Sequence, residues 1–257
     1  MIKYGVSELG VIPVRKEPND RSEMTTQILF GETFQIIAQE NQWCFIKISI
    51  DDYEGWIDSK NISFISEDIF SKIKEDTGSI ITQKLSNLIL NAKNEQIILP
   101  AGSTLSGFNK ADMTFKIGEN EYHLSDEIND GKTHIISLAK QFLNSPYLWG
   151  GKNPFGIDCS GFVQVLFKIM NIKLPRDASQ QINKGQTINF ISDVNPGDLA
   201  FFDNEEGNIT HVGILINSSE IIHASGKVRI DKFDQQGIYN TDLKKYTHKL
   251  RLIKRIK

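Results

Sequence analysis

The hydrophobic pattern of the chain changes near Gly131, and this change constrains the fold more than any other feature. Before Gly131, short apolar runs such as Phe34–Ile37 and Trp43–Ile48 alternate with polar turns, a pattern typical of short β-strands. After it, apolar residues are spaced three and four apart in "THIISLAKQFLNS" and again in "CSGFVQVLFKIM", which predicts amphipathic helices. We therefore expect a multidomain protein, all-β at first and α+β afterwards.

Three domains are predicted. Residues 1–66 have the strand pattern of a small barrel, because closing so short a sheet removes its exposed edges. Residues 67–128 begin with the polar, helix-compatible "SEDIFSKIKED", and their "LPAGSTLSGF" weakly echoes the earlier "LFGETFQIIA", which favours a second, divergent small barrel. Residues 129–257 are predicted to hold two helices followed by an antiparallel sheet. Its strands are expected at Leu199–Phe202, His211–Ile216, Glu220–Ala224 and Val228–Ile230, with the lysine-rich C-terminal segment as an edge strand.

Composition places the chain among ordinary globular proteins, with 257 residues, 39% hydrophobic residues and a net charge of -3. We expect no transmembrane helix, because no apolar run approaches about 18 residues, and no secretory signal. Two cysteines cannot build a disulfide framework, so both are predicted to be free thiols in a reducing, cytoplasmic setting. The basic C-terminal segment alternates like a strand, so we expect no nucleic-acid partner. We also expect no membrane partner and a monomeric protein.

Cys159 is predicted to open the second helix. Backbone N–H groups and the positive end of the helix dipole would then favour its thiolate, which is the nucleophilic form. The small Ser160 and Gly161 would leave the first helical turn open to a substrate. A buried structural thiol is the alternative for an isolated cysteine, and Cys44, within an alternating strand, is assigned that role.

Two of the five histidines stand in predicted neighbouring strands, "THVGILI" and "EIIHAS". If a short turn joins these strands as a hairpin, His211 and His223 face the same side of the sheet. A cysteine, a histidine base and a polar residue that orients the base are the arrangement used in cysteine acyl transfer. A zinc site is disfavoured because the chain has no Cys-x-x-Cys and no His-x-x-x-His. His123, His134 and His248 show no partner pattern.

These segments also resemble a known family. "DCSGF", "HVGI" and "IHAS", in that order, together with "PYLWGG" and "NPGDLAFF", resemble the NlpC-type branch of papain-like cysteine peptidases. The resemblance implies a papain-like fold, with Cys159 as nucleophile, His211 as base and His223 as the residue that orients the base. It also implies that Tyr147 lies near the oxyanion and that no cofactor is needed. Residues 1–66 are similar to bacterial SH3-like domains at Val14-Arg15, Gly31-Glu32, Trp43 and "DYEGWI".

The combination of these domains, with "LPRDASQQ" after the nucleophile, resembles γ-D-glutamyl-L-diamino acid endopeptidases that recycle cell-wall peptides. This resemblance implies stem-peptide substrates with a free N-terminal L-Ala, whose amine is held by acidic groups and a tyrosine. Burial of an ammonium group does require a carboxylate partner. Tyr53 and Asp177 match by position, whereas Glu23 competes with Asp20 for the second acidic position.

Several alternatives stay open. Asp158 is either a helix cap or a second contact to the substrate amine, Arg176 contacts a substrate carboxylate or lies on the solvated surface, and Tyr53 could simply pack in a core. The alternative functions are a hydrolase of intact peptidoglycan with SH3-like wall anchors, and a non-catalytic module that binds stem peptides. Preference for diaminopimelate or lysine is undetermined.

Overall fold

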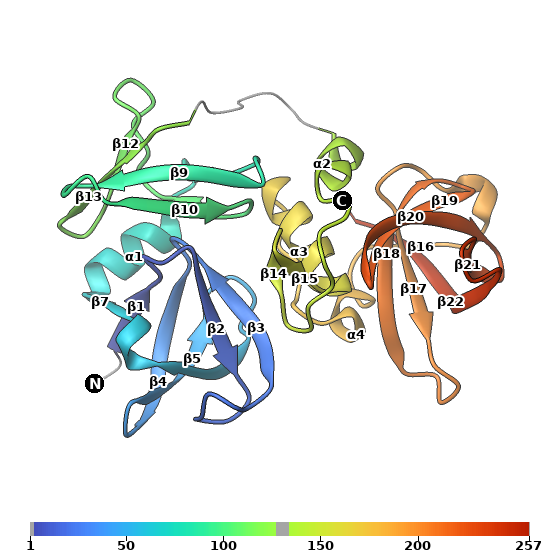
Figure 1. Ribbon diagram of the computed structural model, residues 1–257, viewed down its shortest axis with the longest axis horizontal. Helices are drawn as coiled ribbons and strands as arrows, with labels where there is room; N and C mark the ends of the chain where they lie inside the picture. The colour runs from blue at the N-terminus through green and yellow to red at the C-terminus, as the bar shows by residue number, and fades with distance from the viewer. Residues whose placement is uncertain (1–2, 127–133, 257) are drawn as a thin grey trace. The chain divides into compact units, whose positions relative to one another are not determined.

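The computed structural model describes residues 3–126 and 134–256, and the chain divides into two compact units, residues 1–131 and 132–257 (Figure 1). Among these described residues no helix is long and apolar enough to span a membrane. Both cysteines are buried and unpaired with one another, so the predicted free thiols are confirmed.

The first unit opens with a seven-stranded antiparallel sheet in the order β3-β2-β6-β5-β4-β1-β7. Alternating apolar side chains of β2, β4 and β5 form its core together with Cys44, which is fully buried. The strands of this sheet are β1 (Lys3–Val6), β2 (Val11–Arg15), β3 (Met24–Leu29), β4 (Thr33–Glu40), β5 (Trp43–Ile48), β6 (Glu54–Asp58) and β7 (Ser63–Ile65), with the 3-10 helix η1 (Ser59–Asn61) before the last.

The helix α1 (Glu67–Glu75) follows, as expected from its polar pattern, and Ser66 caps it by accepting a hydrogen bond from the N–H of Ile69. Beyond it lie a four-stranded sheet, β10-β9-β13-β12, and a two-stranded pair, β11-β8. These strands are β8 (Ile80–Ile81), β9 (Ser86–Asn91), β10 (Gln96–Pro100), β11 (Thr104–Leu105), β12 (Thr114–Ile117) and β13 (Asn120–Leu124). Val6 of β1 and Phe30, in the turn after β3, pack into the core of the second sheet. A separate barrel over 67–128 stays a prediction.

The second unit contains α2 (Ile135–Gln141), the short pair β14 (Lys152–Asn153) and β15 (Gly156–Ile157), α3 (Cys159–Ile169) and α4 (Ala178–Gln181) ahead of a large sheet. His134 caps α2 by accepting a hydrogen bond from the N–H of Ile136. The helix α3 is buried along almost its whole length and packs against β18 and β19. The sheet contains β16 (Gln186–Ile188), β17 (Leu199–Asp203), β18 (Ile209–Asn217), β19 (Glu220–Ser225), β20 (Lys227–Asp234), β21 (Gly237–Asn240) and β22 (Lys245–Arg255), with η2 (Ile191–Asp193) after β16.

Six of these strands form a closed barrel. The sheet order β22-β17-β18-β19-β20-β21 closes through an additional pairing between β22 and β21. The barrel interior is filled by apolar side chains such as Phe202, Leu215, Phe233 and Ile253. The strand predictions between 199 and 230 are confirmed. The prediction of an edge strand at the C-terminal segment is wrong: β22 pairs with β17 on one side and with β21 and β16 on the other. The alternating sequence of β22 therefore belongs to a strand inside the closed barrel and not to a strand at an exposed sheet edge.

Candidate active site

Cys159 is the first residue of α3, as the sequence predicts. Asp158 is the N-cap of this helix, and its Oδ1 accepts a hydrogen bond from the N–H of Gly161 at 2.7 Å. A Cβ at Gly161 would lie only 2.3 Å from the carbonyl oxygen of Gly151. The glycine therefore lets the loop that precedes the cysteine lie directly on the first turn of the helix.

A buried ion pair fixes this helix start from the other side. Arg176 is 1% exposed, and its guanidinium donates to both carboxylate oxygens of Asp158 and, at 2.8 Å, to the hydroxyl of Ser160. The second carboxylate oxygen of Asp158 also accepts from the N–H of Gly150 at 2.8 Å. The cap prediction for Asp158 is thus confirmed, and the solvated-surface alternative for Arg176 is wrong. A substrate contact by either residue stays a prediction.

The Cys159 sulfur lies against the barrel strand β18. It accepts backbone hydrogen bonds from Val212 on β18 and from Ser160. Burial, with a further contribution from the Asp158 charge, nevertheless raises the pKa of the Cys159 thiol to about 12. The expectation that the helix start would favour thiolate is therefore wrong for the free protein. Removing the sulfur from water and placing it beside a carboxylate outweigh the helix-start donors and the Arg176 charge.

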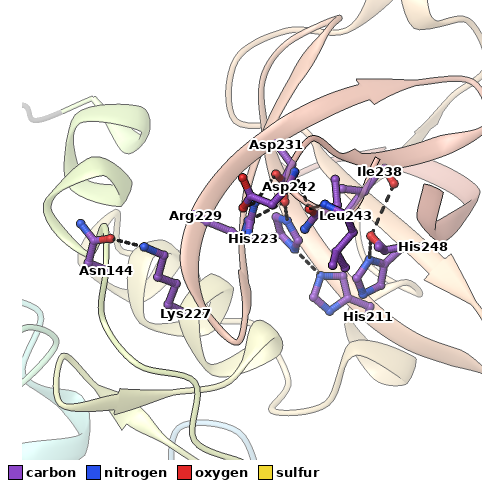
Figure 2. A network of polar contacts seen from close by, with 12 residues as sticks. Asn144, His211, His223, Lys227, Arg229, Asp231, Ile238, Asp242, Leu243 and His248 are labelled. Atoms are coloured by element: carbon purple, nitrogen blue, oxygen red, sulfur yellow. Dashed lines mark hydrogen bonds and ion pairs between the residues drawn. The ribbon is translucent and has the colours of Figure 1, made fainter. Parts of the chain in front are cut away.

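The two predicted histidines lie on adjacent strands, His211 on β18 and His223 on β19, with their rings in contact (Figure 2). The distance between Nε2 of His211 and Nδ1 of His223 is 2.8 Å. Gly213 makes room for this contact, because a Cβ there would lie 2.9 Å from the Cβ of His223. The prediction that a hairpin brings both histidines to the same face is confirmed.

A further polar contact joins His223 to Asp231. Nε2 of His223 lies 3.1 Å from Oδ2 of Asp231 on β20, and both side chains are 1% exposed. Arg229 holds the carboxylate from its outer side, with Nη2 2.8 Å from Oδ1 of Asp231, and it also pairs with Asp242 (Figure 2). We call His211, His223 and Asp231 the histidine relay.

His248 on β22 also lies in the site. Its ring stacks on that of His211 with a centroid distance of 4.2 Å, and the ring of Phe202 lies 5.7 Å from His211. Burial and the neighbouring His223 and His248 hold the pKa of His211 well below its usual range, so its imidazole is neutral at pH 7. Burial likewise lowers the pKa of His248 to about 4.

The relay and His248 occupy one end of the barrel interior. Side chains two or four residues apart on a strand share a face. Each of the four shares its face with a residue of the barrel core: His211 with Leu215, His223 with Ile221, Asp231 with Phe233, and His248 with Leu250. The nucleophile thus comes from a helix outside the barrel and the base from inside it.

Tyr147 lies in the loop before the cysteine, and its N–H donates to the carbonyl of Gly226 at 3.0 Å. Burial, with the neighbouring Cys159 and Asp158, raises the pKa of the Tyr147 hydroxyl to about 12, so this group is a neutral donor near the sulfur. Ser160, the residue after Cys159, is buried in the first turn of α3. Both predicted near-site residues therefore surround Cys159, and their part in catalysis stays a prediction.

The predicted amine-binding residues lie in both units. In the first, Tyr53 packs its ring against the core of the first sheet, and Glu23 forms an exposed ion pair with Lys16 at 3.6 Å. Asp20 is exposed. In the second, Asp177 is the half-buried N-cap position of α4. The part of each in binding substrate stays a prediction.

Sequence reasoning missed Asp231, Arg229 and His248. A signal existed for Asp231. Strands β19 and β20 are joined at Gly226, and their antiparallel register pairs Asp231 with Ile221. Ile221 and His223 share one face of β19, so Asp231 lies on that face too. No local signal marks His248, which barrel closure brings to His211. Within the described residues, no cluster of three or more His, Cys, Asp or Glu side chains is arranged to hold a metal ion.

Comparison with known proteins agrees with this geometry. Residues 144–248 match the NlpC/P60 family, and residues 14–62 match the bacterial dipeptidyl-peptidase SH3 domain. A probable endopeptidase of Haemophilus influenzae is 34% identical to this chain over 128 residues, which cover 48% of this chain and 79% of that protein. These matches confirm the predicted fold class.

More of the chain aligns with two peptidases. A γ-D-glutamyl-L-lysine dipeptidyl-peptidase of Bacillus subtilis is 28% identical over 77% of this chain and 71% of its own. Dipeptidyl-peptidase 6 of Lysinibacillus sphaericus is 27% identical over 88% and 91%. The crystal structure of an NlpC/P60 family protein from Bacillus cereus superposes with a TM-score of 0.81 over 98% of this chain and 99% of that one, at 18% identity, which indicates a shared fold.

Proposed function

The chain belongs to the NlpC/P60 family of cysteine peptidases, and from this premise we propose that it hydrolyses peptidoglycan stem peptides. The bond cleaved is the one between γ-D-glutamate and the following diamino acid, in peptides with a free N-terminal L-Ala. The product is L-Ala-D-Glu, and the setting is the recycling of wall peptides in the cytoplasm. The observation that carries the proposal is the buried contact of 2.8 Å between His211 and His223, on the barrel whose strand β18 also places the Val212 backbone against the sulfur of the helix-start Cys159.

The protonation states favour general-base catalysis. The pKa of the Cys159 thiol is raised and that of the His211 imidazole is lowered, so both groups are neutral before substrate arrives. His211 therefore takes the Cys159 proton as the sulfur attacks the γ-carbonyl carbon. The tetrahedral intermediate collapses when the resulting imidazolium protonates the departing amine of the diamino acid. Water, deprotonated by His211, then attacks the thioester carbonyl and releases the dipeptide with restoration of the thiol.

The N–H groups at the start of α3 differ in whether they already have an acceptor. The N–H of Gly161 is taken by the Asp158 carboxylate, that of Phe162 by the Asp158 carbonyl, and that of Ser160 by the sulfur. The N–H of Cys159 is the remaining donor of the first turn, and we assign it to the developing oxyanion together with the Tyr147 hydroxyl. Loss of one such donor costs about 3 kcal/mol in studied enzymes.

Substrate choice rests on the relatives and on charge. Two relatives that align over most of this chain are named as dipeptidyl-peptidases, and an enzyme of this type must recognise the free amine of a peptide. Carboxylates and a tyrosine are the groups that would hold a buried ammonium. Asp177 of the second unit is such a carboxylate, and a part of Tyr53 and of Glu23 or Asp20 in holding the amine stays a prediction from the family resemblance.

The test of specificity compares L-Ala-γ-D-Glu-diamino acid peptides, with diaminopimelate or lysine in the third position, before and after N-acetylation. The expected result is release of L-Ala-D-Glu from the free peptide and at least a hundredfold loss of kcat/KM on acetylation, about 3 kcal/mol of lost ion pairing. Equal rates for both peptides would refute recognition of the amine. Release of soluble fragments from intact peptidoglycan at a comparable rate would favour the wall-hydrolase alternative.

The test of chemistry is Cys159→Ala. The variant is expected to bind the free peptide with unchanged affinity, measured by calorimetry, and to lose all turnover. Wild-type protein that binds the peptide without cleaving it would favour the non-catalytic binding module. Activity that survives the substitution would remove Cys159 as the nucleophile.

A further inference from the structure

We propose that Asp231 is a positioning residue that fixes the tautomers of both relay histidines, so that Nδ1 of His211 is the unprotonated base atom. The proposal rests on the proposed function, because it concerns the same base, but it makes a separate statement about where two protons reside. It follows from the order of donors and acceptors along the relay (Figure 2).

The directions of the hydrogen bonds follow from the carboxylate end. An ionised carboxylate only accepts, so the 3.1 Å contact between Asp231 Oδ2 and His223 Nε2 requires the hydrogen on that nitrogen. A neutral His223 then has a bare Nδ1, which can only accept. Its 2.8 Å partner, Nε2 of His211, must therefore be the donor. With its hydrogen on Nε2, a neutral His211 has its lone pair on Nδ1.

The surroundings of Asp231 keep it ionised. Arg229 of the same strand lies with Nη2 at 2.8 Å from Oδ1 and Nε at 2.8 Å from Oδ2, so both oxygens face a cation. Burial alone raises the pKa of this carboxyl, and the hydrogen bonds from His223 and Arg229 outweigh burial and hold the pKa below its usual range. Beside the relay residues themselves lie the charged Arg229 of β20 and the titratable His248 of β22, with Asp242 outside Arg229.

Without the carboxylate, nothing determines which histidine is the donor and which the acceptor in the hydrogen bond between them. An amide at position 231 can donate as well as accept, so His223 can have its hydrogen on Nδ1 and donate it back to Nε2 of His211. His211 would then have its hydrogen on Nδ1, the atom that must take the proton of the thiol. In serine proteases, the equivalent replacement of the carboxylate by an amide leaves the geometry intact and lowers kcat about 10⁴-fold through the wrong tautomer.

Nitrogen-15 NMR of histidine-labelled protein without substrate tests the proton positions directly. Protonated and bare imidazole nitrogens have well-separated shifts, and single histidine replacements assign the signals. The expected result at neutral pH is that both His211 and His223 have their hydrogen on Nε2. A wild-type His211 with its hydrogen on Nδ1 would overturn the proposal, whatever the protein cleaves.

Asp231→Asn and Asp231→Leu test the consequence, with Asp234→Asn as the matched control. Asp234 is on the same strand, and its carboxylate accepts a hydrogen bond from Tyr246 outside the relay. We expect both Asp231 variants to show mixed or reversed tautomers and a kcat lower by about 10²- to 10⁴-fold, with KM little changed, and the control to match wild type.

Wild-type tautomers and wild-type kcat in a folded Asp231→Asn protein would overturn the proposal. Circular dichroism and the NMR spectrum itself identify a variant that has not folded. If wild-type protein cleaves none of the stem peptides, the proposed function fails, while the tautomer measurement still decides the role of Asp231.

Discussion

Replacing His248 with phenylalanine is expected to remove a defined part of the acid sensitivity of the fold. In the folded protein the pKa of His248 is about 4, chiefly because the ring is buried, whereas the unfolded chain has the ordinary value of 6.5. Between these two values the unfolded state binds more protons, so stability falls as pH falls from about 6.5 towards 4. Each pKa unit corresponds to 1.36 kcal/mol.

The full shift corresponds to about 3 kcal/mol at pH 4, and partial exposure of the ring reduces our expectation to about 2 kcal/mol. Phenylalanine keeps a flat ring against His211 and does not titrate. The loss of unfolding free energy between pH 7 and pH 4 should therefore be smaller in His248→Phe by about this amount. His211 adds its own acid sensitivity in both proteins, and because His248 contributes to the low pKa of His211, the replacement reduces this second contribution in the same direction.

The assay is urea unfolding of the full chain at several pH values, followed by circular dichroism, for wild type and variant. Proton NMR of the His248 ring gives its titration midpoint independently, and the expected midpoint lies near 4. Equal losses of stability in the two proteins, or a midpoint near 6.5, would refute the assignment of His248 as a buried neutral ring.

Three further predictions concern the helix start and the hairpin. Gly213→Ala should lower the unfolding free energy by about 1–3 kcal/mol and lower kcat more than it raises KM, since its Cβ displaces His223; wild-type stability and kinetics would contradict the close contact. Asp158→Ala should lower the unfolding free energy by about 3–5 kcal/mol, because Arg176 stays buried after its ion pair with Asp158 is removed, and a loss of only about 1 kcal/mol would indicate a cap alone. Alkylation of Cys159 by iodoacetamide, followed by mass spectrometry, should keep accelerating above about pH 9; a plateau near neutral pH would indicate a preformed thiolate.

The chemistry-bearing residues that the sequence could identify are those marked by local patterns. Cys159 stands at a loop-to-helix transition, and His211 and His223 lie on consecutive strands of one hairpin, so short-range pairing brings their rings together. The family motifs strengthened each assignment without depending on the rest of the fold.

The remaining features depend on long-range structure. The low-pKa expectation for Cys159 considered only the backbone N–H groups and the dipole at the helix start, whereas burial and the adjacent Asp158 raise the pKa of the thiol. His248 reaches His211 only because β22 pairs with β17 and β21, and the same pairing overturned the edge-strand prediction. Alternation in a sequence gives the period of a strand but not the number of its neighbours.

Closure of the barrel also ties the appearance of activity to a late step of folding. The β18–β19 hairpin that holds His211 and His223 can form from neighbouring residues, but Phe202 pairs with Leu250, far along the chain. Such non-local contacts form slowly, because a long loop must close first. His248 reaches His211, and the apolar wall around the base is complete, only when β22 is in place. A refolding chain should therefore acquire its secondary structure before its peptidase activity, and partly folded intermediates should be inactive towards peptides.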